Sequence, residues 1–72
     1  MATACISYVE QVGETAGLVW SYLDAHGPQT LTKLVRSVDA HRDLVLQAVG
    51  WLAREEKLWI DESGRTKTVH LR

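Results

Sequence analysis

A chain of 72 residues has room for one small domain, and its composition excludes several classes of protein. Apolar residues make up 46% and charged residues 24%, which is typical of a globular protein and not of a disordered one. No apolar run approaches the roughly 20 residues that a membrane-spanning helix needs. The net charge of -1 lacks the basic excess that most small DNA-binding domains carry.

Cysteine usage and the first residues bear on the cellular compartment. Cys5 is the only cysteine, so an internal disulfide is excluded and a reducing environment fits. The first six residues contain neither a basic region nor a long apolar segment, so no secretory signal is expected. Cys5 has two possible roles: it forms a disulfide between two copies of the chain, or it is a terminal thiol without a function. We therefore expect a cytoplasmic protein.

The segment 8–26 is predicted to form the first helix, because its apolar residues recur at helical spacing. Gly27-Pro28 ends it, since glycine adopts the left-handed turn and proline blocks continuation. Gly13 and Gly17 each cost about 1 kcal/mol of helix propensity relative to alanine. The pair therefore predicts close approach by the backbone of a neighbouring element, with a weakly formed helix start near Gly13 as the alternative. The residues expected on the buried stripe are Val9, Val12, Ala16, Val19, Trp20 and Leu23.

Two further helices are predicted, over 31–37 and over about 40–56. Thr30 is the expected N-cap of the first, and Asp39 that of the second. Their tight connection is typical of a helix-turn-helix unit. The residues expected in the core are Leu31, Leu34, Val35 and Val38 from the first helix, and Leu44, Val45, Ala48, Val49, Trp51 and Leu52 from the second.

Residues 58–71 alternate between apolar and polar side chains, which predicts a β-hairpin that turns near Ser63-Gly64. Two strands alone are marginally stable, so this hairpin needs the helices beneath it. The segment 29–31 is a candidate for a brief third strand at the edge. A register that brings the apolar residues of both strands to one face pairs Ile60 with Lys67 and Leu58 with Val69.

The order of these elements predicts the fold. Three helices followed by a two-stranded wing make a single winged helix-turn-helix domain over residues 1–72. The predicted fold class is α+β, mostly α, with the wing at 58–71 and the short third strand left open.

Two segments carry a more specific pattern: GETAGLVWSYL at 13–23 and GWLAREEKL at 50–58. A glycine pair and a tryptophan in the first helix, then Gly-Trp-Leu-Ala-Arg-Glu before the wing, resemble a family of small stand-alone bacterial winged helix-turn-helix proteins. That family is catalogued as a domain of unknown function, and the resemblance covers nearly the whole chain. It implies the fold and a nucleic-acid-binding label, but no catalytic or ligand residues. Trp59 departs from the pattern, since a polar residue is expected on that outward face.

DNA binding is the first functional hypothesis, because a helix-turn-helix protein places its recognition helix in the major groove. The outward face of 40–56 carries few polar groups, and Asp43 there would repel phosphate. A solvated surface is the alternative role for the same residues. Those expected to reach double-stranded DNA are Arg42, Gln47 and Arg54 in the groove, with Lys33, Arg36, Arg65 and Lys67 on phosphates.

A protein-interaction or dimerisation module without DNA binding is the second hypothesis, because several apolar side chains fall outside the predicted core. A small domain gains stability from self-association, so a symmetric homodimer is expected. Covering the edge of the core is the alternative role for two of these residues, Leu18 and Tyr22. The residues proposed for the partner surface are Leu18, Tyr22, Leu46 and Trp59.

Catalytic and metal-binding patterns are missing from the sequence. His26, His41 and His70 are far apart, and none has ligand spacing with Cys5 or another histidine. There is no nucleotide-binding glycine loop and no nucleophile elbow. We therefore expect no enzymatic activity, no cofactor, no metal and no small-molecule substrate.

Overall fold

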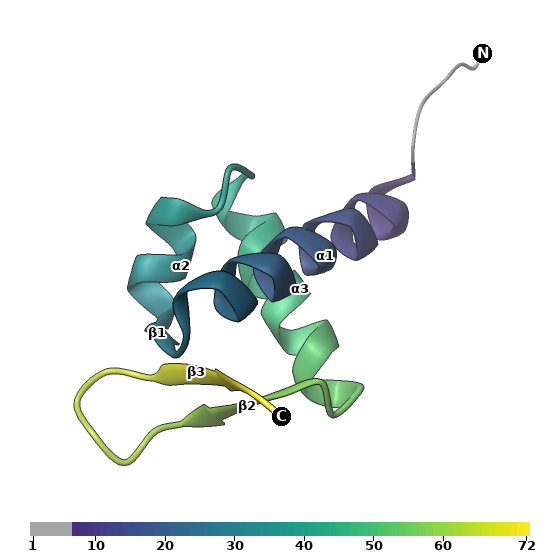
Figure 1. Ribbon diagram of the computed structural model, residues 1–72. Coiled ribbons are helices and arrows are strands. Elements are labelled where there is room, and N and C mark those ends of the chain that lie inside the picture. The colour runs from purple at the N-terminus through teal and green to yellow at the C-terminus, as the bar shows by residue number, and fades with distance from the viewer. Residues whose placement is uncertain (1–6) are drawn as a thin grey trace.

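The computed structural model describes residues 7–72, in which three helices lie above a small antiparallel sheet (Figure 1). This arrangement confirms the predicted mostly helical α+β winged-helix fold. The expectations for Cys5 and for the first six residues lie outside the described residues. None of the described helices is long and apolar enough to cross a membrane. The elements in chain order are α1 (Tyr8–His26), β1 (Gln29–Thr30), α2 (Leu31–Ser37), α3 (Arg42–Arg54), β2 (Leu58–Asp61) and β3 (Thr68–Leu71).

Local side-chain chemistry defines both ends of α1. The Glu10 N–H donates to Ser7 Oγ at 3.2 Å, and the Ser7 N–H donates to Glu10 Oε1 at 3.0 Å. These reciprocal bonds form a capping box that satisfies two backbone donors at the helix start. At the other end, Gly27 adopts a φ of 79°, and its N–H donates to the Leu23 carbonyl at 2.8 Å. The predicted range 8–26 is therefore confirmed.

The caps of α2 and α3 confirm one prediction and correct another. Thr30 caps α2 as expected, accepting a hydrogen bond from the Lys33 N–H at 3.1 Å. Asp39 does not cap α3, because the chain turns tightly after α2, with the Ala40 N–H on the Val38 carbonyl at 2.8 Å. His41 is the N-cap instead, and its Nδ1 accepts from the Asp43 N–H at 3.2 Å. The predicted start of this helix at 40 was therefore two residues too early.

The predicted end of the third helix was also wrong by two residues. The helix stops at Arg54 because Glu56 adopts a left-handed φ of 61°. The Lys57 N–H then donates to the Leu52 carbonyl at 2.9 Å, and the Glu56 N–H donates to the Ala53 carbonyl at 3.1 Å. This pair of bonds is the Schellman arrangement, in which glycine usually occupies the left-handed position. The turn directs the chain straight into β2.

The sheet has the strand order β1-β3-β2, so the brief third strand is present at one edge. Pairing of Gln29 with Val69 places β1 beside β3. The predicted hairpin register was wrong by two residues, because the loop over 62–67 is longer than expected. Side chains alternate with a period of two, so this slip keeps the same residues on the inner face. The observed pairs are Leu58 with Leu71, Trp59 with His70, Ile60 with Val69 and Asp61 with Thr68.

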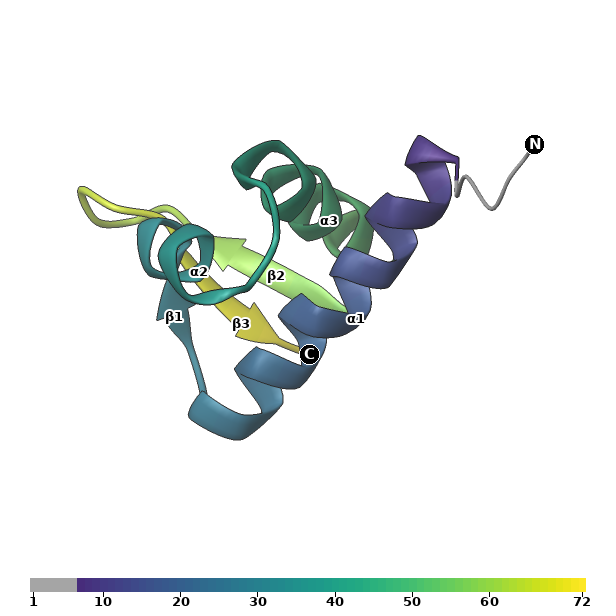
Figure 2. The same ribbon diagram turned by 90° about the horizontal axis from the view of Figure 1, so that it is seen from above.

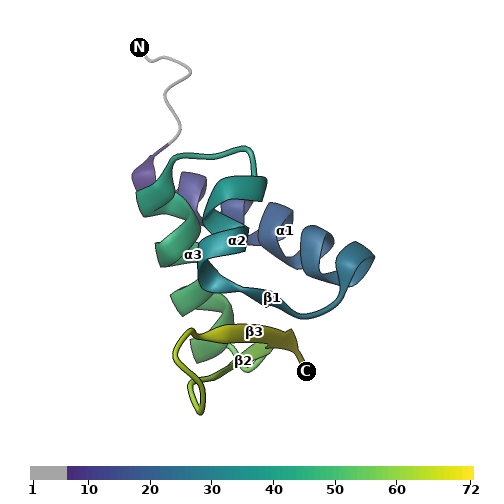
Figure 3. The ribbon, with the colours of Figure 1, turned by 90° about the vertical axis from the view of Figure 1, so that its left-hand side faces the viewer.

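All three helices and the sheet contribute to one core. Helix α1 packs mainly against α3, while α2 lies on the other side of α3 and the sheet closes the bottom (Figures 1 and 3). Seen from above, α2 lies over one end of the sheet and α1 passes over the other end (Figure 2). The buried apolar residues are Ala16, Val19, Leu23, Leu34, Val38, Val45, Ala48, Val49, Leu52, Leu58 and Val69.

Three residues predicted to be buried lie at the surface. The exposed fraction is 67% for Val9, 42% for Trp20 and 48% for Trp51. Trp20 and Trp51 line an open hollow between α1 and the end of α3. The close approach predicted from the glycine pair is also absent from the described residues, because a Cβ added at Gly13 or Gly17 would meet no atom within 4 Å.

The hairpin loop is expected to respond to acid through Asp61. Its carboxylate accepts hydrogen bonds from the Ser63 N–H at 3.0 Å and from Ser63 Oγ at 2.7 Å. These bonds, the backbone one first, hold the pKa of Asp61 below its ordinary value of 3.8. A lowered pKa in the folded state means that the stabilisation is present above the ordinary value and is lost as pH falls through the folded pKa.

An NMR titration checks this expectation. The Asp61 side-chain carboxyl carbon should titrate with a midpoint below 3.8, and the Ser63 amide should shift with the same midpoint. Replacing Ser63 with alanine should return the midpoint only part of the way, because the backbone donor remains. A wild-type midpoint at or above the ordinary value would contradict the hydrogen-bonded loop.

Candidate nucleic-acid interface

The outward side of α3 carries two of the predicted groove residues. Gln47 and Arg54 are exposed and lie seven residues apart, which is two helical turns, so they share one side. Gly50 lies between them, and a Cβ added there would meet no atom within 4 Å. The opposite side of α3 is buried in the core. The helix therefore presents two long polar side chains, and the glycine between them leaves the backbone uncovered.

A shallow hollow of about 260 Å³ between α2 and α3 brings together two of the predicted phosphate and groove residues. Arg36 from α2 and Arg42 from the first turn of α3 both line it, beside the apolar side chains of Val35 and Leu46. We call this feature the Arg36–Arg42 hollow. Two guanidinium groups at the rim of an apolar hollow suit a phosphate or another anion that carries an apolar part. Leu46 is half-buried and lines this hollow.

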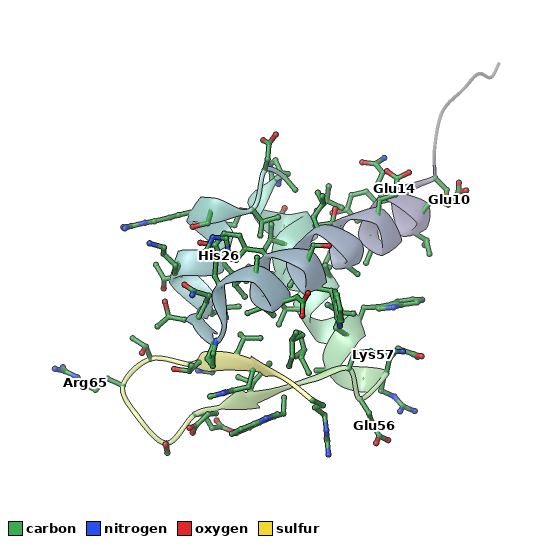
Figure 4. The ribbon with its side chains drawn as sticks, in the orientation of Figure 1. Glu10, Glu14, His26, Glu56, Lys57 and Arg65 are labelled. Carbon is green, nitrogen blue, oxygen red and sulfur yellow. The ribbon has the colours of Figure 1, made fainter. Side chains whose placement is uncertain are left out.

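The hairpin loop supplies the remaining cations. Arg65 and Lys67 are exposed in the loop, and Arg65 points away from the body of the domain (Figure 4). The Leu31 N–H donates to the Lys67 carbonyl at 2.9 Å, which joins the base of the loop to the start of α2. Lys33 is exposed one turn into α2. The cations of α2 and of the wing therefore lie on directly connected elements.

The charge distribution differs between α1 and the rest of the domain. Helix α1 carries three carboxylates and no lysine or arginine, whereas residues 27–72 carry eight lysines or arginines against six aspartates or glutamates. Glu10 and Glu14 lie at the end of the molecule away from Arg65 (Figure 4). Within residues 7–72 the one close ion pair is His41–Asp43 at 4.0 Å, so the lysines and arginines there are not neutralised by salt bridges. Asp43 alone opposes phosphate on the outward side of α3.

The four residues predicted for a partner surface are not brought together. Leu18 and Tyr22 lie on α1, and the Tyr22 ring stacks on His26 with ring centroids 4.1 Å apart. Trp59 is exposed on the outer face of the sheet, where it stacks on His70 at 4.3 Å. In the described part of the chain, no three histidine, cysteine, aspartate or glutamate side chains gather as a metal site would require.

A family model, a relative and a solved structure are similar to this chain. A family model described as "Winged helix-turn-helix domain (DUF2582)" matches residues 8–71. The uncharacterized protein MJ1608 of Methanocaldococcus jannaschii is 31% identical over 65 residues, a match that covers 86% of this chain and 91% of that protein. The solution NMR structure of protein BT2368 from Bacteroides thetaiotaomicron has a TM-score of 0.76 and 32% identity, covering 86% of this chain and 76% of that one. The chain therefore belongs to the winged helix-turn-helix family DUF2582, a domain of unknown function, as its glycine and tryptophan motifs predicted.

Proposed function

We propose that this protein is a non-catalytic, cytoplasmic winged-helix protein that binds double-stranded DNA. The observation that carries the proposal is that exposed cations without salt bridges lie on α2, α3 and the wing loop, with Arg36 and Arg42 around one hollow, whereas α1 carries only carboxylates. Phosphate neutralisation supplies much of the affinity of DNA-binding proteins, so the local charge matters more than the net charge of -1. A role in transcription is the process that such a domain would serve.

The proposed contacts follow from the geometry of α3. With this helix in the major groove, Gln47 and Arg54 reach base edges, and Gly50 allows the groove wall to approach the helix closely. The Arg36–Arg42 hollow receives a backbone phosphate, and Lys33 and Lys67 contact neighbouring phosphates. Arg65, at the tip of the loop, enters the adjacent minor groove. Asp43 weakens this binding by repelling phosphate.

Fluorescence anisotropy of a labelled duplex tests the proposal. We expect anisotropy to rise at micromolar protein in low salt, and the binding constant to fall steeply as salt increases. A labelled single strand of the same sequence is the control, and it should bind more weakly, because a groove-reading helix needs a duplex. Unchanged anisotropy at micromolar protein and low salt would defeat the DNA-binding proposal.

A protein-interaction role is the second candidate, and the three exposed tryptophans favour it. Large apolar side chains at a surface mark interaction sites in many proteins. This role is compatible with DNA binding, because two winged-helix units joined in a symmetric pair can address two half-sites.

A further inference from the structure

We propose that a groove between α1 and the end of α3 is the surface through which two copies of this chain form a symmetric homodimer. The groove has a volume of about 410 Å³ and is open to solvent. Gly13 and Gly17 form part of its floor, Trp20 and Trp51 stand on its two sides, and Lys57 lies at its rim. We call it the Gly-Trp groove. None of these five residues belongs to the candidate nucleic-acid interface, so the inference stands independently of DNA binding.

Nothing among residues 7–72 of a single copy requires glycine at the two glycine positions of the groove. Each glycine costs about 1 kcal/mol of helix propensity relative to alanine. Neither has the positive φ that favours glycine, and a Cβ at either position would meet no atom within 4 Å. The fold of one chain would therefore accept alanine at both sites. Glycines four residues apart on a helix let another backbone approach closely, and none of residues 7–72 makes that approach here.

The tryptophans show that the groove is suited to a protein partner. Trp20 follows Gly17 by three residues, so both lie on the same side of α1, while Trp51 faces them from α3. Both indole rings are more than two-fifths exposed in a single copy. Each copy therefore has less than half of two indole rings left to bury, which supplies a minor share of the roughly 800 Å² per partner of a standard interface. The rest of the groove lining and the acidic half of α1 would have to supply the remainder.

Charge complementarity favours a second copy as the occupant. The exposed charges of α1 are Glu10, Glu14 and Asp24, which would repel a nucleic acid. The cation at the rim of the groove is Lys57, close to the end of α3 (Figure 4). An antiparallel crossing of two α1 helices about a two-fold axis places Gly13 of one copy against the partner's Gly17. The acidic first half of each α1 then runs toward the partner's Trp20 and Lys57.

The proposed dimer has the two-fold symmetry expected from the sequence, but it uses a different surface from the predicted one. The residues predicted from sequence for a partner surface lie on three different parts of the molecule, whereas the Gly-Trp groove is continuous. A two-fold pair buries the same patch on both copies, so it closes and does not extend into a filament. The Arg36–Arg42 hollow lies on the α2 side of α3 and remains open in each copy.

Sedimentation velocity on the full chain, without DNA, tests the dimer. Wild type should change from monomer to dimer as its concentration rises. Gly17→Leu places a branched side chain in the groove and should weaken dimerisation at least tenfold. Helical circular dichroism checks that α1 of the variant still folds, since a Cβ at this position meets no atom within 4 Å. Ala25→Leu is the matched control: it adds a leucine side chain on an exposed part of α1 outside the groove and should leave the dimer intact.

A charge exchange tests the orientation of the two helices. Lys57→Glu should weaken the dimer by placing like charges together, and adding Glu14→Lys to that variant should restore it while leaving the Ser7–Glu10 capping box intact. Wild type that stays monomeric at hundreds of micromolar would overturn the dimer. A dimer that withstands Gly17→Leu, or one that Ala25→Leu disrupts equally, would overturn the Gly-Trp groove as its interface. Failure of the exchange to restore the dimer would overturn the antiparallel crossing.

Discussion

Replacing Leu34 with alanine is expected to lower the free energy of unfolding by about 2–5 kcal/mol. Leu34 lies in the middle of α2, and its exposed fraction is 0%. Truncation removes apolar contacts and leaves a cavity that helices held on several sides cannot fill. A domain this small has a total stability near the lower end of the usual range of about 5–15 kcal/mol, so the variant should be close to unfolded at room temperature.

Urea unfolding followed by circular dichroism measures this loss. Leu18→Ala is the matched control, because Leu18 is 50% exposed on α1, and it should change stability by less than about 0.5 kcal/mol. All variants need the same protein concentration, because self-association would add to the apparent stability. Equal unfolding midpoints for the two variants would show that α2 does not pack on the core as described.

Replacing both Arg36 and Arg42 with alanine is expected to weaken duplex binding by about tenfold or more and to flatten its salt dependence. The hollow that they share holds two guanidinium groups from different elements at one place. Loss of two phosphate contacts should reduce the slope of log K against log salt by about 1.8. The effect should be similar on all duplex sequences, because phosphate contacts carry no base information.

Anisotropy titrations at several salt concentrations measure this slope. Arg72→Ala is the control, because Arg72 follows β3 at the end opposite the hairpin loop, and the slope should not change. An unchanged slope in the double variant would exclude the Arg36–Arg42 hollow from the interface while leaving other contacts to explain binding. Equal losses in the double variant and in the control would indicate a general charge effect and no defined site.

Much of the fold could be predicted because its determinants are local. The first helix ends where Gly27 adopts a positive φ, and the second begins where Thr30 caps it; both signals act over a few residues. Alternation over 58–71 predicted the wing and its inner face. The register slipped by two residues because a period of two is the same after such a shift.

The exposure of individual side chains could not be predicted from the sequence, because it depends on where neighbouring elements begin and end. Helical spacing predicted that Trp20 and Trp51 are buried. It could not show that the packing of α1 on α3 leaves both side chains more than two-fifths exposed. The sequence also predicted a close neighbour at Gly13 and Gly17, but a Cβ added at either position would meet no atom within 4 Å. The sequence by itself determined the elements and their inward faces, because capping, turns and periodicity are short-range. Only the packing of α2 and α1 on α3 decided which side chains share the Arg36–Arg42 hollow and the Gly-Trp groove, because each is built from residues that the chain brings together from different helices.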